Sequence, residues 1–162
     1  MSIPSGAEIC AVADAHDTSI VRELFLEYAR SLSFSLCFQN FERELAELPG
    51  EYAPPAGILL LARVKGEAAG CVALHAFHKS HDICEMKRLY VRPAFRAFGI
   101  GAALASSAID SARQIGYQRM RLDTVPGEMA AAVRMYERLG FRDIAPYREN
   151  PRPDTRYMEL EL

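Results

Sequence analysis

The stretch that most constrains the fold is a basic, glycine-containing loop between a strand-like and a helix-like segment, over residues 89–104. The pattern predicts the end of a strand, the loop, and then a helix that begins near Gly99. None of the preferred N-cap residues (Ser, Thr, Asp or Asn) precedes this helix, because Ala97, Phe98 and Gly99 occupy those positions. The first backbone N–H groups of the helix are therefore left without a side-chain acceptor.

The residues of this loop favour an anionic ligand. Gly99 and Gly101 lack the Cβ atoms that would keep a ligand away from the backbone. Arg92 and Arg96 add positive charge beside the positive end of the helix dipole. Such an arrangement is typical of phosphate or pyrophosphate binding. Because a two-glycine loop fits several phosphate compounds, the surrounding residues have to decide among them.

Two motifs surround and include this loop. An Arg-x-x-Gly-x-Gly pattern spans residues 96–101, and a Tyr-x-x-x-Gly-Phe pattern spans residues 136–141. Together they resemble the GNAT superfamily of acyl-coenzyme-A-dependent N-acetyltransferases, whose coenzyme loop reads Gln/Arg-x-x-Gly-x-Gly/Ala. The chain departs from the family at one visible place, since many members have Gly after the loop Arg and this chain has Ala97.

The resemblance implies how coenzyme A would bind. The loop would hold the pyrophosphate, and the strand before it would be bulged and splayed from its neighbour. Backbone groups of Leu89 and Val91 would then bind the pantetheine arm, and a free N–H there would stabilise the developing oxyanion. The coenzyme-binding residues that we predict on this basis are Leu89, Tyr90, Val91, Phe95, Arg96, Ala97, Phe98, Gly99, Ile100, Gly101 and Ala102.

Tyr136 is the candidate general acid. It shares an inward stripe with Met129, Val133 and Leu139 on a predicted helix, so its hydroxyl needs a buried partner. A phenol with a pKa of about 10 can donate a proton to a thiolate whose conjugate acid has a pKa of about 8.5. The resemblance assigns Tyr136 that role. The alternative is a core tyrosine whose hydroxyl bonds to a carbonyl.

Glu85 is the candidate general base. It precedes Leu89 by four residues, so the two side chains share a face wherever the strand period of two holds. The resemblance equates Glu85 with a strand glutamate that some members use, in some cases through a water, to deprotonate the amine. The alternatives are an exposed residue paired with Lys87 or Arg121, with a water chain or a backbone carbonyl taking the proton.

Hydrophobic periodicity and turn residues predict alternating strands and helices. The expected strands are 8–13, 57–64, 68–77, 83–91, 119–124 and 157–162. The expected helices run from Asp17 or Thr18 to 32, and over 41–48, 99–116 and 126–139. Three consecutive strands joined by short turns form an antiparallel meander. The predicted fold is α/β of the α+β type, a GNAT-like mixed, mostly antiparallel central sheet with helices on both faces, in a single domain over residues 1–162.

Composition excludes several classes of protein. With 162 residues, half of them hydrophobic, the chain can bury the core of one domain and is not of the disordered type. Its longest apolar run, 58–62, is far shorter than the roughly 20 residues of a membrane span. A net charge of −2 argues against a nucleic-acid partner. We expect a cytoplasmic protein with no signal peptide and no membrane partner. The resemblance also allows a homodimer.

Other residues suggest weaker hypotheses. The four cysteines, Cys10, Cys37, Cys71 and Cys84, have no metal or disulfide spacing, so we expect reduced, structural thiols. A spacing of three residues does not bring His75, His78 and His81 together on a strand, and no metal is expected.

Asp123 and three arginines suggest two further kinds of site. Asp123 follows the glycine loop at the distance of a ribose-binding acid, but Leu104 replaces the third glycine of a dinucleotide fingerprint. The arginines Arg113, Arg119 and Arg121 suit a solvated face or a site for the coenzyme's 3′-phosphate better than a nucleic-acid surface.

The sequence therefore predicts transfer of an acetyl group from acetyl-CoA to a primary amine by direct attack in a ternary complex, with no metal. The amine would belong to a small molecule, a peptide N-terminus or a lysine, gripped by residues 34–38 and 147–154. The alternative is a non-catalytic acyl-CoA-binding module that regulates a partner protein.

Overall fold

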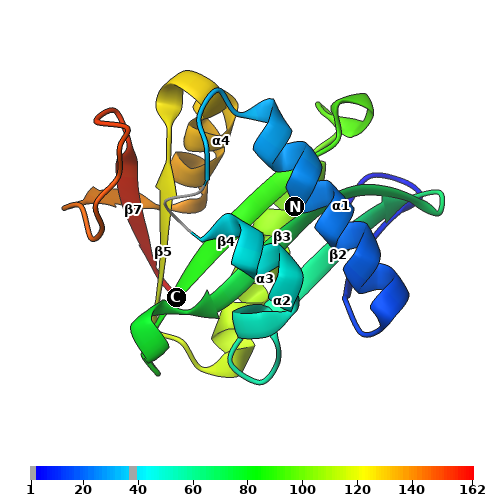
Figure 1. Cartoon of the computed structure of the whole chain (residues 1–162), viewed down its shortest axis with the longest axis horizontal. Helices are drawn as coiled ribbons and strands as arrows, with labels where there is room; N and C mark the ends of the chain where they lie inside the picture. The colour runs from blue at the N-terminus through cyan, green and yellow to red at the C-terminus, as the bar shows by residue number, and fades with distance from the viewer. Residues whose placement is uncertain (1–2, 37–39) are drawn as a thin grey trace.

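The computed structural model describes residues 3–36 and 40–162. A seven-stranded sheet has the order β1-β2-β3-β4-β5-β7-β6 (Figure 1). Its strands are β1 (Ala7–Ala11), β2 (Ile58–Val64), β3 (Glu67–Ala76), β4 (Ile83–Val91), β5 (Arg119–Thr124), β6 (Arg142–Ile144) and β7 (Arg156–Glu161). Neighbouring strands are antiparallel except β4 and β5, which are parallel. The mixed, mostly antiparallel sheet that we predicted is confirmed.

Helices cover both faces of this sheet. Side chains of α1 (Ala15–Ser31) and α2 (Phe41–Glu47) pack on one face, and those of α3 (Ile100–Ile115) and α4 (Pro126–Leu139) on the other (Figure 1). Short 3₁₀ turns, η2 (Gly50–Tyr52), η3 (Phe77–Lys79) and η4 (Pro93–Phe95), connect the larger elements. Among the helices in the described ranges, none has the length and apolar character needed to cross a membrane.

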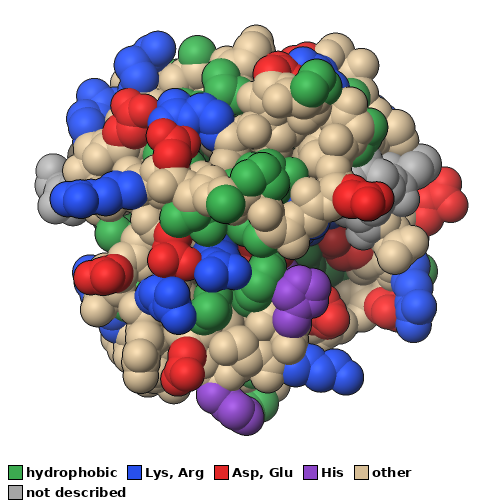
Figure 2. Space-filling view, turned by 90° about the vertical axis from the view of Figure 1, so that its left-hand side faces the viewer, with side chains coloured by type: hydrophobic (Ala, Val, Ile, Leu, Met, Phe, Trp, Pro, Cys, Tyr) green, Lys and Arg blue, Asp and Glu red, His purple; other side chains and the backbone are tan. Residues whose placement is uncertain are grey.

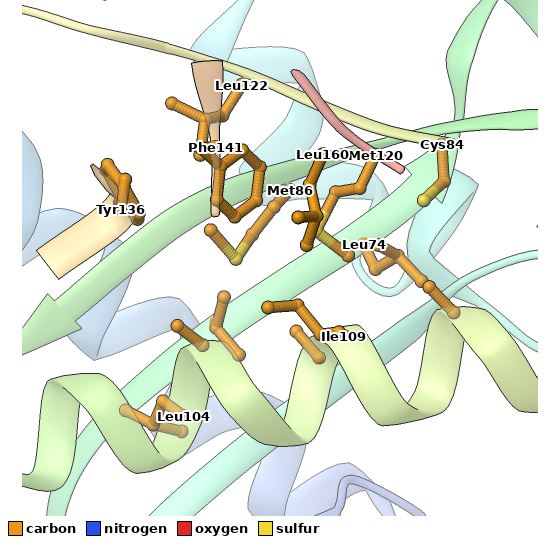
Figure 3. Packing of buried hydrophobic residues seen from close by; sticks show 14 of the residues in the cluster. Leu74, Cys84, Met86, Leu104, Ile109, Met120, Leu122, Tyr136, Phe141 and Leu160 are labelled. Carbon is orange, nitrogen blue, oxygen red and sulfur yellow. The ribbon is translucent and has the colours of Figure 1, made fainter. Parts of the chain in front are cut away.

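Two hydrophobic cores sandwich the sheet. On the α3 side, Ile109 points toward strand residues such as Leu74 and Met86, and Leu104 and Tyr136 belong to the same cluster (Figure 3). The core on the α1 side is a separate cluster around the buried helix residues Val21, Leu24 and Phe25. The period-2 alternation of the strands sends successive side chains to these two cores.

The strands β4 and β5 separate soon after they meet. They pair only over Ile83–Glu85 and Arg119–Arg121, and within the described residues no pairing between them continues beyond that point. In Figure 1 the two strands spread apart from this short junction. A bulge interrupts the pairing of β4 with β3, and within it Arg88 adopts a left-handed φ of 60°. The sheet thus opens between β4 and β5.

Some boundaries differ from the expected ones. The helix α1 begins at Ala15, because the Asp14 carboxylate caps it by accepting the Asp17 N–H at 2.8 Å. The expected caps, Asp17 and Thr18, lie inside the first turn instead. Strand β6 was not predicted, because three residues are too few to show an alternation.

The cysteines divide into buried and exposed ones. Cys71 and Cys84 are buried and free, as predicted, whereas Cys10 is exposed rather than packed. Burial raises the pKa of the Cys84 thiol to about 12 and that of Cys71 further. Cys37 lies outside the described residues.

Candidate active site

The start of α3 has the open geometry that the loop predicts. Gly99 is the N-cap residue with a φ of 80°, and it makes no side-chain capping bond. A Cβ on Gly101 would meet only the Val91 Cγ2 atom, at 3.6 Å, which is an ordinary contact. A Cβ on Gly99 would meet no atom of the described residues within 4 Å, so both glycines leave room for a ligand beside the start of α3.

The residues before Gly99 shape the loop. The Nε–H of Arg96 donates to the Val91 carbonyl at 2.9 Å, and its guanidinium lies 5.7 Å from the ring centre of Tyr90. Arg96 thus ties the loop to the end of β4. Ala97 has a φ of 67°, a left-handed conformation that glycine adopts at lower cost. This conformation gives a physical reason for the glycine that many GNAT members have at this position.

A cavity of about 450 Å³ lies beside this loop, between β4, β5 and α4. Most of the predicted coenzyme-binding residues line it: Leu89, Tyr90, Val91, Phe95, Arg96, Ala97, Gly99, Ile100 and Gly101. Phe98 and Ala102 are not among its lining residues, and the Phe98 side chain is 64% exposed. The opening between β4 and β5 and the start of α3 therefore belong to one site.

Tyr136 lines the same cavity. It is buried on α4, with its ring centre 5.7 Å from that of Phe141. Burial raises its pKa, so the phenol keeps its proton at neutral pH. Within the described residues its hydroxyl has no hydrogen-bond partner. Among the described residues, Tyr136 thus lines the cavity without the hydrogen bond to a carbonyl that the alternative, a core tyrosine, would make.

Glu85 lies in a different environment. Its buried carboxylate accepts hydrogen bonds from His75 Nε2 at 2.9 Å, the Tyr147 hydroxyl at 3.0 Å and Arg148 Nη2 at 2.5 Å. Burial alone would raise its pKa, but the His75 hydrogen bond and the charges of Lys87 and Arg148 outweigh burial and lower the pKa to about 2. A carboxylate with three donors and such a pKa is a weak proton acceptor.

The expectation that Glu85 and Leu89 share a face is wrong. The bulge at Arg88 inserts one residue into the alternation, so Leu89 and Val91 pack against the α3-side core. Glu85 faces the other side, where its partner His75 meets Tyr52 edge to face with ring centres 5.6 Å apart. There Glu85 lines a second cavity of about 400 Å³, and the lining of the main cavity does not include it.

The residues of the main cavity that were missed as site residues include Tyr28, Lys87 and Asp123. Burial lowers the pKa of Lys87 to about 8 and raises that of Asp123. The buried Oδ2 of Asp123 accepts no hydrogen bond within the described residues, and Arg148 Nη1 lies 3.5 Å from it. The alternation of β5 places Asp123 two residues beyond Arg121, on the face of Glu85, which is a signal that the sequence did carry.

The arginines near β5 are paired with acids. Arg121 Nε lies 2.7 Å from a Glu159 carboxylate oxygen on β7, and Arg119 lies 3.7 Å from the other oxygen. Arg113 pairs with Asp110 at 3.5 Å on the surface of α3. The expected solvated face describes Arg113 and Arg119, whereas Arg121 is largely buried beside Glu159 and the ring of Phe77.

Comparisons with known proteins agree with this geometry. The model of the acetyltransferase (GNAT) family matches residues 20–141. An uncharacterized N-acetyltransferase of Schizosaccharomyces pombe is 42% identical, over 100% of this chain and 99% of its own length. The uncharacterized N-acetyltransferase YjgM of Escherichia coli is 30% identical, over 77% of this chain and 74% of its own.

Solved structures show the same fold. The acetyltransferase YncA of Salmonella typhimurium, determined with its cofactor acetyl-CoA, superposes with a TM-score of 0.75 at 21% identity, covering 97% of this chain and 94% of its own. An open β4–β5 junction, an uncapped α3 start and a buried tyrosine on α4 thus occur in a chain with acetyltransferase relatives. The chain belongs to the GNAT family of acetyltransferases and is an acetyltransferase enzyme.

Proposed function

We propose that this protein transfers an acetyl group from acetyl-CoA to a primary amine by direct attack in a ternary complex. The observation that carries the proposal is the single cavity that joins the start of α3, the opening beside β4 and the Tyr136 side chain. In it the pyrophosphate would lie on the N–H groups after Gly99, and the pantetheine arm along Leu89–Val91. The acetyl-CoA in the Salmonella relative supports this choice of donor.

The chemistry divides among few groups. The free amine attacks the thioester carbonyl carbon, and a backbone N–H of β4 stabilises the oxyanion that develops. The C–S bond then breaks and the coenzyme leaves as a thiolate. Tyr136 donates its phenolic proton to that thiolate, since its buried hydroxyl is protonated and faces the cavity.

The role of Glu85 as general base stays a prediction, and the surroundings of its carboxylate restrict how it could act. A base has to lie within hydrogen-bond reach of the amine, directly or through one water. Glu85 already accepts three hydrogen bonds, and it lines a cavity other than that of Tyr136. Base catalysis by Glu85 would therefore require the Tyr147 or Arg148 side chain to move and admit a water.

The acceptor would enter between the two segments that we predicted to grip it. The Arg152 guanidinium lies 5.1 Å from the ring centre of Phe34, and Ser33 hydrogen-bonds Glu128. Phe34 and Asn150 both line the main cavity. Residues 37 and 38 of the first segment lie outside the described residues. These contacts support an amine-binding region of the main cavity beside Phe34 and Asn150.

Two measurements test the proposal. Calorimetry with coenzyme A should show binding without added metal, and no binding at millimolar concentration would refute the whole assignment. Release of free thiol from acetyl-CoA should then be followed with a panel of amino acids, peptides with a free N-terminus, lysine peptides and simple alkylamines. Coenzyme binding without thiol release for any of these amines would favour the alternative, a regulatory acyl-CoA-binding module.

A further inference from the structure

The main cavity is lined by the carboxylate of Asp123, whereas Glu85 lines the second cavity. Asp123 lies near the end of β5, beyond the point at which β4 and β5 separate, and it lines the cavity together with Tyr136. Its side chain is 12% exposed, and its Oδ2 atom is buried without a hydrogen-bond donor among the described residues. A buried carboxylate oxygen without such a bond costs free energy, so its retention calls for an explanation.

The contact with Arg148 does not provide that explanation. Arg148 Nη2 lies 2.5 Å from Glu85, whereas Nη1 lies 3.5 Å from Asp123 Oδ2, outside hydrogen-bond geometry. The Arg148 guanidinium thus donates a hydrogen bond to Glu85, whereas it attracts Asp123 electrostatically without donating a hydrogen bond to it. An ammonium group in the cavity could supply the missing donor.

Resting on the proposed acetyl transfer, we propose that the Asp123 carboxylate binds the ammonium group of the acceptor and removes its proton. Asp123 and Glu85 then differ in role. Asp123 touches the substrate, and Glu85 holds Tyr147 and Arg148 in place beside it. Burial raises the pKa of Asp123, which makes it a better proton acceptor than Glu85, whose pKa is lowered to about 2.

The protons balance over one turnover. Asp123 takes one proton from R–NH₃⁺ and later releases it to solvent. The neutral amine forms the new C–N bond, and the attacking nitrogen becomes positively charged. As the C–S bond breaks, Tyr136 gives its proton to the thiolate and regains one from that nitrogen, directly or through water. The products are the amide, coenzyme A with a free thiol, and one proton.

The groups around Asp123 determine how the reaction depends on pH. The charged ones are Glu85, Lys87, Arg88 and Arg148. The tyrosines Tyr28, Tyr136, Tyr147 and Tyr157 also interact with it, and raised pKa values keep them neutral below about pH 10. Of the charged groups only Lys87, with a pKa of about 8, changes charge between pH 5 and 9. We therefore assign the fall of kcat/KM at acidic pH to protonation of Asp123, and any change of kcat/KM at alkaline pH to deprotonation of Lys87.

The test is the pH profile of kcat/KM for Asp123→Asn, with the most active amine of the panel. The parent should lose activity as the pH falls through the raised pKa of Asp123. The variant should be slower by about 10²-fold or more at pH 7, with KM for acetyl-CoA unchanged. Its rate should then rise about tenfold for each pH unit toward the pKa of the amine, because only free amine reacts.

Two further variants complete the design. Asp143→Asn makes the same change on exposed β6 and should match the parent. Asp123→Glu keeps a carboxylate and should retain an acidic limb even with a lower kcat. It also covers the case in which Asp123→Asn folds poorly, since an Asp123→Glu profile without that limb would overturn the assignment.

The outcomes separate the two proposals. An active parent with an Asp123→Asn profile that is parallel to it, whether equal or uniformly lower, overturns the role of Asp123 and leaves acetyl transfer intact. The loss of the acidic limb in Glu85→Gln, with the limb retained in Asp123→Asn, would do the same and return the base role to Glu85. A parent that binds coenzyme A but acetylates no amine refutes both.

Discussion

At the scale of single residues, the site depends on what each polar group contacts. Sequence reasoning predicted from the helical stripe that Tyr136 faces inward, and the residue is indeed buried and lines the main cavity. It could not find the three donors around Glu85, because His75, Tyr147 and Arg148 come from two distant segments. Asp123 was visible in the strand pattern but was considered only as a ribose ligand. Residue type and spacing identify candidates, whereas hydrogen-bond partners decide their chemistry.

Replacing Tyr136 with Phe should lower kcat and leave the affinity for coenzyme A nearly unchanged. The substitution keeps the ring that packs 5.7 Å from Phe141 and removes only a hydroxyl that has no protein partner in the described structure. Loss of a proton donor typically costs about 10²–10⁴-fold in rate. Steady-state kinetics with calorimetry would check this, and a variant as fast as the parent would make Tyr136 a packing residue.

Glu85 should also make stability depend on pH. Its pKa falls from 4.5 to about 2 on folding, so its ionised form stabilises the folded state above pH 4.5. That contribution, on the order of 3 kcal/mol, is lost as the pH falls from 4.5 to about 2. Denaturant unfolding at a series of pH values should show a smaller loss over this window for Glu85→Gln. Equal losses in both proteins would contradict the depressed pKa.

At the scale of elements, strand β4 shows what the hydrophobic pattern can predict and what it cannot. Its span, Ile83–Val91, was predicted correctly. The bulge at Arg88 was not located, because a left-handed residue inside a strand leaves no mark in the hydrophobic pattern. Everything after the bulge changes face, which is why Glu85 and Leu89 were placed on the same side. The start of α3 was predictable because the absence of a cap is itself a sequence feature.

The bulge is held by an ion pair with α2. Arg88 donates to both Glu44 carboxylate oxygens, at 2.8 and 2.9 Å, and its side chain is almost fully buried. Arg88→Met should cost about 3–5 kcal/mol of the free energy of unfolding, because it leaves the Glu44 carboxylate without this partner. Arg43→Met on the same helix breaks an exposed pair and should change little. Thermal melts that show equal effects would argue against an anchoring role for Arg88.

The start of α3 can be blocked without disturbing the fold. Gly101→Val adds atoms in open space, since a Cβ there meets only Val91 at an ordinary distance. The side chain should occupy the place of the pyrophosphate and raise the Kd for coenzyme A at least tenfold, a loss of about 1.4 kcal/mol. Gln114→Val, exposed in the last turn of the same helix, controls for helix propensity. Calorimetry on both variants would check this, and an unchanged Kd for Gly101→Val would place the phosphates elsewhere.

At the scale of the whole molecule, two half-sheets are joined by one short parallel junction. The antiparallel meander β2-β3-β4 and the helices on both faces followed from the sequence pattern, because strands joined by short turns allow few arrangements, whereas the position of β7 between β5 and β6 was not predicted. The ion pairs of the outer strands could not be predicted from that pattern, because side-chain partners across β6 and β7 depend on the register of the two strands. Figure 2, viewed from the side on which β7 lies in Figure 1, shows acidic and basic side chains interspersed around a hydrophobic centre.

A ligand that spans the junction should stabilise the molecule as a whole. Acetyl-CoA bound in the main cavity, which residues of both β4 and β5 line, would contact both half-sheets, and the unfolded chain would offer no such site. At a concentration about 100 times its Kd it should add about 2.7 kcal/mol and raise the Tm by roughly 5–10 °C. Differential scanning calorimetry with Gly101→Val as the insensitive control would test this, and equal shifts in both proteins would indicate binding at another place.

The divergence of β4 from β5 has a consequence for handling the protein. Past Glu85, β4 is no longer covered by β5, and an uncovered strand edge is a template on which another chain can add a strand. A coenzyme arm lying along that edge would shield it. We therefore expect the ligand-free protein to aggregate more readily on concentration or mild heating than the coenzyme-saturated protein, at equal fractions unfolded. The opening that admits the acetyl donor is then also the place at which the ligand-free enzyme is most prone to aggregate.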